Sequence, residues 1–249
     1  MSGHSKWSTI KRKKSAEDAK RGKIFTRIAK EVTLAAREGG GDESMNPKLA
    51  LAVSKAKAAN MPKDNIERAI KKGTGELEGG QLESFTYEGY GIDGVAFIVE
   101  VLTDNKNRAL AEVKNAFNKN GGSLASNGAV SWQFEQKGYI TITREGVDFD
   151  ELFLVAAEAG AEDVVDEGDA ILVFTPREAY GAVESTLREN GYKVEDGELR
   201  WFAQNETVLP VSKAMQNMRL LERLEDLDDV QSVSSNLEIT EELALAYDE

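Results

Sequence analysis

The sequence contains no cysteine and only one histidine, His4, in 249 residues. Without thiols it can form no disulfide, no thiolate zinc site and no cysteine nucleophile. A single histidine leaves almost nothing from which to build a histidine metal centre or a Ser-His-Asp triad. Carboxylates are abundant, yet no pair is set apart by its spacing or by an apolar setting that would shift its pKa. We therefore expect a protein that is not an enzyme and that has no metal and no cofactor.

Long apolar runs are also lacking. The run Val95–Val99 ends at Glu100 and is far too short to cross a bilayer. The N-terminus is basic, but it has no apolar segment of the kind found in secretory signals. These features predict a cytoplasmic protein with no membrane partner.

One glycine-rich segment has the residue types and spacing of a nucleotide-binding motif. Gly89-Tyr90-Gly91-Ile92-Asp93-Gly94 fits the pattern G-x-G-x-x-G. The nucleotide-binding form follows a strand and opens a helix, so that the helix N-terminus meets the pyrophosphate. Here the glycines precede a predicted strand, and the sequence has no P-loop. The segment is better explained as a turn, and we expect no small-molecule substrate.

The charge of the chain is divided very unevenly along its length. Residues 1–75 hold 18 Lys and Arg against 8 Asp and Glu, whereas residues 76–249 hold 13 against 36. A local basic patch binds phosphates whatever distant parts of the molecule carry, because salt screens charges beyond roughly 8–10 Å. The division therefore indicates a nucleic-acid partner for the N-terminal region.

Three helices are predicted in this basic region, over residues 15–37, 46–59 and 63–73. Asn46 is a suitable N-cap for the second helix, with Pro47 in its first turn, and Gly73 ends the third. The first helix has an apolar stripe of Ile24, Ile28, Val32 and Ala35 and a basic stripe of Lys20, Lys23, Arg27 and Lys30. The third helix carries Lys63, Arg68, Lys71 and Lys72, which suit phosphate contacts better than base readout.

The residues predicted to bind nucleic acid form three groups. Residues 1–14 are a basic arm, the first helix supplies the basic stripe, and the segment 103–108 places two cations where a strand ends and a helix starts. The predicted residues are His4, Lys6, Trp7, Lys11, Arg12, Lys13, Lys14, Lys20, Arg21, Lys23, Arg27, Lys30, Lys106 and Arg108. A plainer interpretation stays open for each group. The charged face of the first helix would simply be solvated, as most such faces are. The tryptophan of the arm either stacks on a base or docks the arm onto the helices. The segment 103–108 would only cap a helix.

The acidic remainder alternates strands and helices. Residues 138–203 follow the order βαββαβ, which is the ferredoxin-like order. Before them come a strand at 94–103, a helix and a strand at 129–135. After them come a strand-like segment at 207–211, a helix at 212–227, a strand at 230–237 and a short helix at 241–247. The two flanks are expected to pair into a second ferredoxin-like domain.

We therefore predict an α+β fold with one ferredoxin-like βαββαβ domain inserted in another. Residues 1–80 form a basic helical domain with its N-terminal arm. Residues 81–136 and 204–249 form a discontinuous domain, and residues 137–203 form the inserted domain. Domain insertion at a surface connection is a common arrangement.

Several long motifs follow one another along nearly the whole chain. They are Gly3-His4-Ser5-Lys6-Trp7, Ala19-Lys20-Arg21-Gly22-Lys23, Asn46-Pro47, Met61-Pro62-Lys63-Asp64-Asn65-Ile66, Gly73-Thr74-Gly75, Tyr87-Glu88-Gly89-Tyr90-Gly91, Thr103-Asp104-Asn105-Lys106-Asn107-Arg108 and Lys119-Asn120-Gly121-Gly122. Through these motifs the sequence resembles the YebC family, which includes the mitochondrial translational activator of cytochrome c oxidase subunit I. The chain begins directly on the first motif, which implies a bacterial cytoplasmic member.

The resemblance implies a helical N-terminal domain followed by two α/β domains, and it carries no catalytic residues. Bacterial members are generally described as probable transcriptional regulatory proteins that bind DNA. Other members act in translation, where they associate with ribosomes and help the synthesis of difficult sequences such as proline runs. The resemblance therefore implies a nucleic-acid partner that is either duplex DNA or ribosomal RNA.

Three hypotheses for the function follow. The first is a non-enzymatic regulator of gene expression, a probable transcriptional regulatory protein that binds DNA through its basic N-terminal domain. The second is a ribosome-associated translation factor that binds structured RNA. The third is a protein-interaction module whose basic end docks an acidic protein, which would keep salt sensitivity but be indifferent to nuclease.

Overall fold

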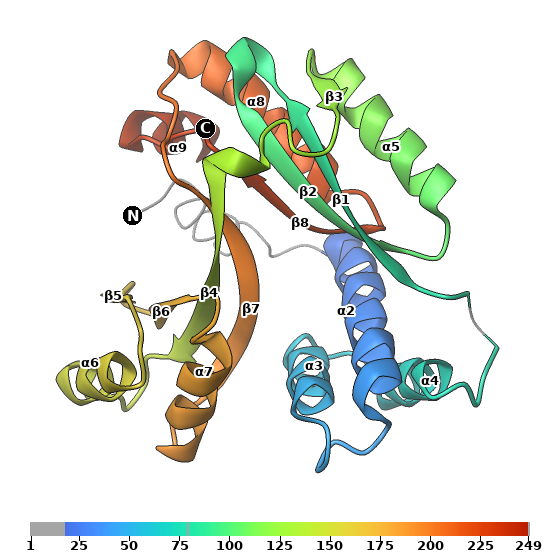
Figure 1. Cartoon of the computed structure of the whole chain (residues 1–249), viewed down its shortest axis with the longest axis vertical. Helices are drawn as coiled ribbons and strands as arrows, with labels where there is room; N and C mark the ends of the chain where they lie inside the picture. The colour runs from blue at the N-terminus through green and yellow to red at the C-terminus, as the bar shows by residue number, and fades with distance from the viewer. Residues whose placement is uncertain (1–17, 79, 249) are drawn as a thin grey trace. The chain divides into compact units, whose positions relative to one another are not determined.

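The chain forms a group of helices, followed by two antiparallel sheets that are each covered by helices (Figure 1). The computed structural model describes residues 18–78 and 80–248. By its internal contacts the chain divides into two compact units. The first contains the described residues up to Glu135 together with those from Phe202 onward, and the second is Gln136–Trp201. The α+β fold class predicted from the sequence is confirmed.

The N-terminal helices of the first unit are those expected from the sequence. They are α2 (Asp18–Gly39), α3 (Pro47–Ala58) and α4 (Lys63–Gly73). The Asn46 side chain caps α3 by accepting a hydrogen bond from the Leu49 amide at 3.1 Å. The same side chain donates to the carbonyls of Ala35 and Gly40, so the cap also ties α3 to the end of α2. The buried stripes of the three helices share one core, which contains Ile28, Val32, Leu49, Val53, Met61 and Ile66.

The sheet of the first unit is antiparallel, with the strand order β3-β1-β2-β8. Its strands are β1 (Glu83–Tyr90), β2 (Ala96–Thr103), β3 (Ser123–Ala125) and β8 (Val230–Ser235). The helices that accompany it are α5 (Lys106–Lys119), α8 (Val211–Glu225) and the short α9 (Glu241–Asp248), with 3₁₀ turns η1 (Ile92–Gly94) and η2 (Ser131–Gln133). Helices α5 and α8 pack with the strands in one core that includes Phe97, Val113, Phe117, Met218 and Leu221.

Three segments of the first unit differ from the predicted secondary structure. The sequence pattern does not predict strand β1, and residues 129–133, expected as a strand, form turns and η2. Glu88 on β1 provides the physical reason, because its buried carboxylate accepts hydrogen bonds from the backbone amides of Gly128, Val130 and Ser131 at 2.7 to 3.0 Å. Amides that point at one carboxylate cannot also pair along a strand edge. The strand-like segment 207–211 reduces to a single parallel bridge between Thr207 and Leu237.

The second unit has the ferredoxin-like arrangement. Its elements are β4 (Phe134–Thr143), α6 (Phe149–Glu158), β5 (Asp163–Asp166), β6 (Ala170–Pro176), α7 (Tyr180–Glu189) and β7 (Val194–Ala203). The strands lie in the order β5-β6-β4-β7, so the two central strands are the first and third of βαββαβ. The core between sheet and helices includes Ile140, Leu152, Val173, Val183 and Leu187.

None of the helices in the described part of the chain combines the length and the apolarity that a membrane crossing needs.

Candidate nucleic-acid interface

The predicted nucleic-acid-binding residues fall into described and undescribed parts of the chain. His4, Lys6, Trp7, Lys11, Arg12, Lys13 and Lys14 lie outside the described residues. Lys20 and Arg21 belong to the first turns of α2, but their side chains are not described either. Lys23, Arg27, Lys30, Lys106 and Arg108 can be placed with their side chains.

The basic stripe of α2 faces the carboxyl end of α8 and the start of β8. The Lys23 ammonium lies 3.3 Å from the Asp226 carboxylate, and both side chains are about half exposed. The Arg27 guanidinium donates a hydrogen bond to the backbone carbonyl of Gln231 at 3.4 Å. In the first unit these cations therefore already have partners in the same chain.

Lys30 and Arg108, which are 78 positions apart in sequence, meet at one buried carboxylate. Lys30 Nζ lies 2.5 Å from Asp229 Oδ1 and also donates to the Asp228 carbonyl. Arg108 binds the same carboxylate through Nε and Nη2, at 3.2 and 2.9 Å, and the Thr103 hydroxyl donates to it at 2.9 Å. Asp229 is only 3% exposed, so these donors, and not water, stabilise its negative charge.

Two opposing influences set the protonation of Asp229. Burial by itself would raise the pKa of this carboxyl, but the hydrogen bonds from Lys30, Arg108 and Thr103 outweigh it and hold the pKa below the ordinary value of 3.8. The pKa of Arg108 is raised by its hydrogen bonds to Asp229 and Asp104. Both shifts favour the charged forms of Asp229 and Arg108 at neutral pH.

Lys106 is placed differently from its neighbour Arg108. Its side chain is exposed, and the ammonium lies 4.8 Å from the centre of the Phe85 ring. This is a cation–π contact on the surface of the sheet domain, and it leaves the ammonium accessible to solvent.

A groove lies between α2 and α4, where the chain leads into the sheet. It encloses about 380 Å³, and its apolar lining is Phe25, Ala29, Met61, Ala69 and Leu82. The polar lining consists of Thr26, Lys30, Thr33, Asn65, Arg68, Lys72 and Asp104. Three cations and one carboxylate therefore border an apolar hollow, and the carboxylate, Asp104, is itself paired with Arg108 at 2.9 Å.

Arg68 and Lys72 are suited to phosphate contacts by the sequence, but they lie outside the three groups of residues predicted to bind nucleic acid. They are exposed and lie one helical turn apart, so both side chains emerge on the same face of α4. Their spacing of four, with Asn65 three positions before Arg68, distinguishes these two cations from Lys63 and Lys71 on the same helix. Asp229 has no comparable signal, because nothing in the sequence indicates that it meets Lys30 and Arg108.

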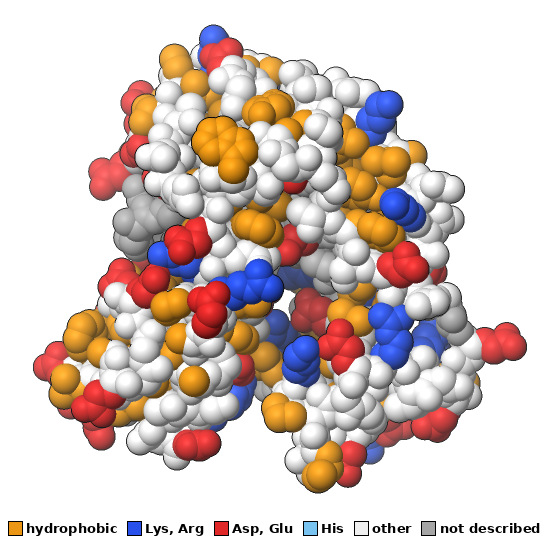
Figure 2. Space-filling model, viewed as in Figure 1, with side chains coloured by type: hydrophobic (Ala, Val, Ile, Leu, Met, Phe, Trp, Pro, Cys, Tyr) orange, Lys and Arg blue, Asp and Glu red, His pale blue; other side chains and the backbone are white. Residues whose placement is uncertain are grey.

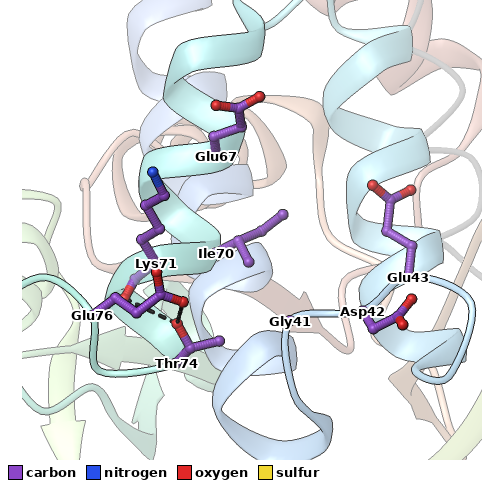
Figure 3. A pocket seen from close by; sticks show the side chains of 8 residues that line it. All are labelled: Gly41, Asp42, Glu43, Glu67, Ile70, Lys71, Thr74 and Glu76. Atoms are coloured by element: carbon purple, nitrogen blue, oxygen red, sulfur yellow. Dashed lines mark hydrogen bonds between the residues drawn. The ribbon is translucent and has the colours of Figure 1, made fainter.

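A second pocket of about 610 Å³ lies between the loop after α2 and the end of α4 (Figure 3). Its charged side chains are Asp42, Glu43, Glu67, Glu76 and Lys71. In the close-up, Glu67 and Lys71 project from α4, whereas Asp42 and Glu43 come from the opposite loop. No group of residues suited to holding a metal ion occurs in the described ranges 18–78 and 80–248. Four carboxylates around one lysine make this pocket unsuited to a polyanion.

On the face seen in Figure 2, the helical region carries side chains of both signs of charge. Exposed lysines there pair with neighbouring glutamates: Lys48 with Glu38, Lys57 with Glu43 and Lys63 with Glu67. The groove between α2 and α4, by contrast, joins three cations to a concave surface.

Comparison with known proteins places these features in a family. Residues 5–76 match the family described as TACO1/YebC protein N-terminal domain, and residues 82–237 match TACO1/YebC second and third domain. A probable transcriptional regulatory protein of Desulforapulum autotrophicum is 54% identical over 98% of each chain. Another of that name, from Geobacter sulfurreducens, is 52% identical over 97% of this chain and 98% of its own. The crystal structure of a conserved hypothetical protein from Aquifex aeolicus is 44% identical, has a TM-score of 0.81 and covers 90% of this chain and 93% of that one.

Proposed function

Because this chain belongs to the TACO1/YebC family, we propose that it regulates gene expression by binding nucleic acid, DNA in the first place, through its helical N-terminal region. The relatives are named as probable regulators of transcription and not as enzymes, which agrees with the non-enzymatic protein expected from the sequence. The DNA target and the surface that contacts it are parts of this proposal.

The observation that carries the proposal is the groove between α2 and α4. Arg68 and Lys72 point into solvent at its edge, with no ion-pair partner among residues 18–78 and 80–248. Cations without a partner in the same chain can neutralise phosphates and release their counterions. Lys23, Arg27 and Lys30 contribute positive potential nearby, but each would have to leave an intramolecular partner to contact a phosphate directly.

A second candidate is structured RNA, as on the ribosome. The concave shape of the groove favours it, because an unpaired base can enter a hollow, whereas duplex DNA is usually read by a convex element that enters its groove. The two candidates share the same phosphate-binding surface.

The test is a titration of the full chain with labelled duplex DNA and, separately, co-sedimentation with ribosomes with and without DNase. We expect binding that weakens by about tenfold or more between about 50 and 200 mM salt, because several phosphates are neutralised. Arg68→Glu with Lys72→Glu should abolish most of this binding while the circular dichroism spectrum stays native. An unchanged affinity of that double variant for both targets would contradict the proposal.

Migration with ribosomes that survives DNase would favour the RNA candidate. Tight binding to duplex DNA, with the protein absent from the ribosome fractions, would favour DNA. Binding to proteins that persists after all nucleic acid has been digested would overturn both.

A further inference from the structure

We propose that the groove between α2 and α4 is a subsite for one unpaired nucleotide, with the base on the apolar lining and the phosphate on Arg68 and Lys72. This inference rests on the proposed function and adds the form of nucleic acid that is recognised. It identifies an unpaired strand, not a duplex, as the preferred ligand of the helical region.

The size of the groove is the first argument. Its volume of about 380 Å³ lies at the lower end of the roughly 300–1,000 Å³ that small-ligand pockets occupy. That space suits a single nucleotide and not a helix or a loop of another protein. A paired base cannot enter, because its faces are stacked and its edges are bonded until it is extruded from the duplex.

The lining is the second argument. Phe25 and Ala29 on α2 are partly exposed, and the largely buried Met61 and Leu82 complete an apolar surface that Lys30, Arg68, Lys72 and Asp104 border. Bases in single strands bury their faces on apolar and aromatic side chains, and one such contact is worth about 1–3 kcal/mol. The apolar side chains can pack against a base, but they make no hydrogen bond or ion pair with a sugar-phosphate backbone.

The rim is the third argument. Arg68 and Lys72 lie on the same edge of α4, close enough for both to contact one phosphate. Asn65 lies on the same face of the helix, and its amide offers a donor and an acceptor to a base edge. The carboxylate of Asp104 at the other side is neutralised by Arg108, so it does not repel the phosphate strongly.

The first experiment compares two adjacent charge reversals on α4. Lys72→Glu changes the groove, whereas Lys71→Glu makes the same change in the acidic pocket on the other side of the helix. Binding is measured by fluorescence anisotropy with a labelled single strand of about 10 nucleotides, as RNA and as DNA, and with a duplex of the same sequence. We expect Lys72→Glu to weaken single-strand binding about tenfold or more and Lys71→Glu to weaken it less than about threefold.

The second experiment fills the groove without changing its charge. Ala29→Leu places a larger side chain on the apolar lining, and Ala58→Leu at an exposed position of α3 is the matched control. We expect Ala29→Leu to reduce single-strand affinity by about tenfold and to leave duplex affinity unchanged, while Ala58→Leu changes neither. Thermal unfolding of each variant shows whether the fold is kept. If Ala29→Leu does not fold, the nucleotide subsite is tested by Lys72→Glu, which changes an exposed position.

The outcomes separate this inference from the proposed function. If the wild type binds the duplex as tightly as the single strand and Lys72→Glu behaves like Lys71→Glu, the nucleotide subsite is wrong, while the duplex binding still supports a nucleic-acid-binding function and the Arg68→Glu and Lys72→Glu double variant tests its surface. If the wild type binds neither single strand nor duplex nor ribosomes, the proposed function fails as well. A preference for the RNA strand over the DNA strand would identify RNA as the source of the unpaired nucleotide, and the reverse would identify melted DNA.

Discussion

At the scale of single residues, the buried carboxylate of Asp229 joins three segments of the first unit at the candidate interface. It is buried, and it accepts hydrogen bonds from Lys30 on α2, Arg108 on α5 and Thr103 at the end of β2. One carboxylate therefore connects the helical region to the sheet of the first unit. Removing one partner of such a cluster leaves the other charges desolvated and uncompensated.

We predict that Asp229→Asn lowers the free energy of unfolding by about 3 kcal/mol at neutral pH, as measured by urea denaturation. The matched control is Asp226→Asn, whose exposed pair with Lys23 should contribute no more than about 1 kcal/mol. Equal midpoints for Asp229→Asn and the wild type would show that the cluster does not stabilise the fold.

The same substitution should change how stability depends on pH. Because the pKa of Asp229 is depressed in the folded state, its contribution is complete above the ordinary value of 3.8 and disappears as the pH falls through the folded-state pKa. The wild type should lose this increment of stability on acidification, whereas Asp229→Asn, which lacks it at every pH, should lose correspondingly less.

At the scale of elements, the contact between α2 and α4 depends on a glycine. A Cβ atom at Gly73 would lie 2.4 Å from the Thr33 carbonyl oxygen and 2.7 Å from the Ala36 Cβ atom, so only glycine lets the end of α4 approach α2 this closely. This approach also holds Arg68 and Lys72 beside the groove.

We predict that Gly73→Ala lowers the free energy of unfolding by about 1–3 kcal/mol through overpacking against the backbone of α2. Gly22→Ala is the control, because a Cβ atom at Gly22 meets no atom of the described residues within 4 Å, and alanine there should stabilise α2 by about 0.5–1 kcal/mol. Chemical denaturation of both variants gives the comparison, and a stabilised Gly73→Ala variant would contradict the close packing.

At the scale of the whole molecule, the chain leaves the first unit and returns to it at neighbouring backbone positions. The Gln204 amide donates to the Gln133 carbonyl at 2.9 Å, so the residues that flank the unit are already joined by a backbone hydrogen bond. A chain that leaves and re-enters through neighbouring backbone positions is the arrangement expected of an inserted domain. The three-domain division remains a prediction.

We predict that replacing residues 136–201 with a short glycine linker of about two to five residues leaves the first unit folded, because a hairpin-sized loop can close this gap. Circular dichroism and a single cooperative thermal transition would support the prediction. Nucleic-acid binding by the shortened protein should also be retained, since the groove lies in the first unit. An aggregated or unfolded product would show that the second unit is required for the first to fold.

The sequence alone determined what is encoded by local periodicity and by composition. The three N-terminal helices followed from apolar spacing, the Asn46 cap and the glycine at the end of α4, all of which act within a few residues. The βαββαβ order of residues 138–203 followed from alternating strand and helix patterns. The absence of cysteine and the single histidine exclude whole classes of chemistry by composition, because a site cannot be built from side chains that the chain lacks.

Only the tertiary structure decided which charged groups meet. Strand β1 was not predicted because Glu88, a charged residue in it, is buried. Its carboxylate accepts hydrogen bonds from backbone amides some 40 positions away. The basic stripe of α2 was expected to be free for phosphates, yet Lys30 reaches Asp229, 199 positions further along the chain. Such contacts depend on how distant segments pack, and neither helix periodicity nor net charge contains that information.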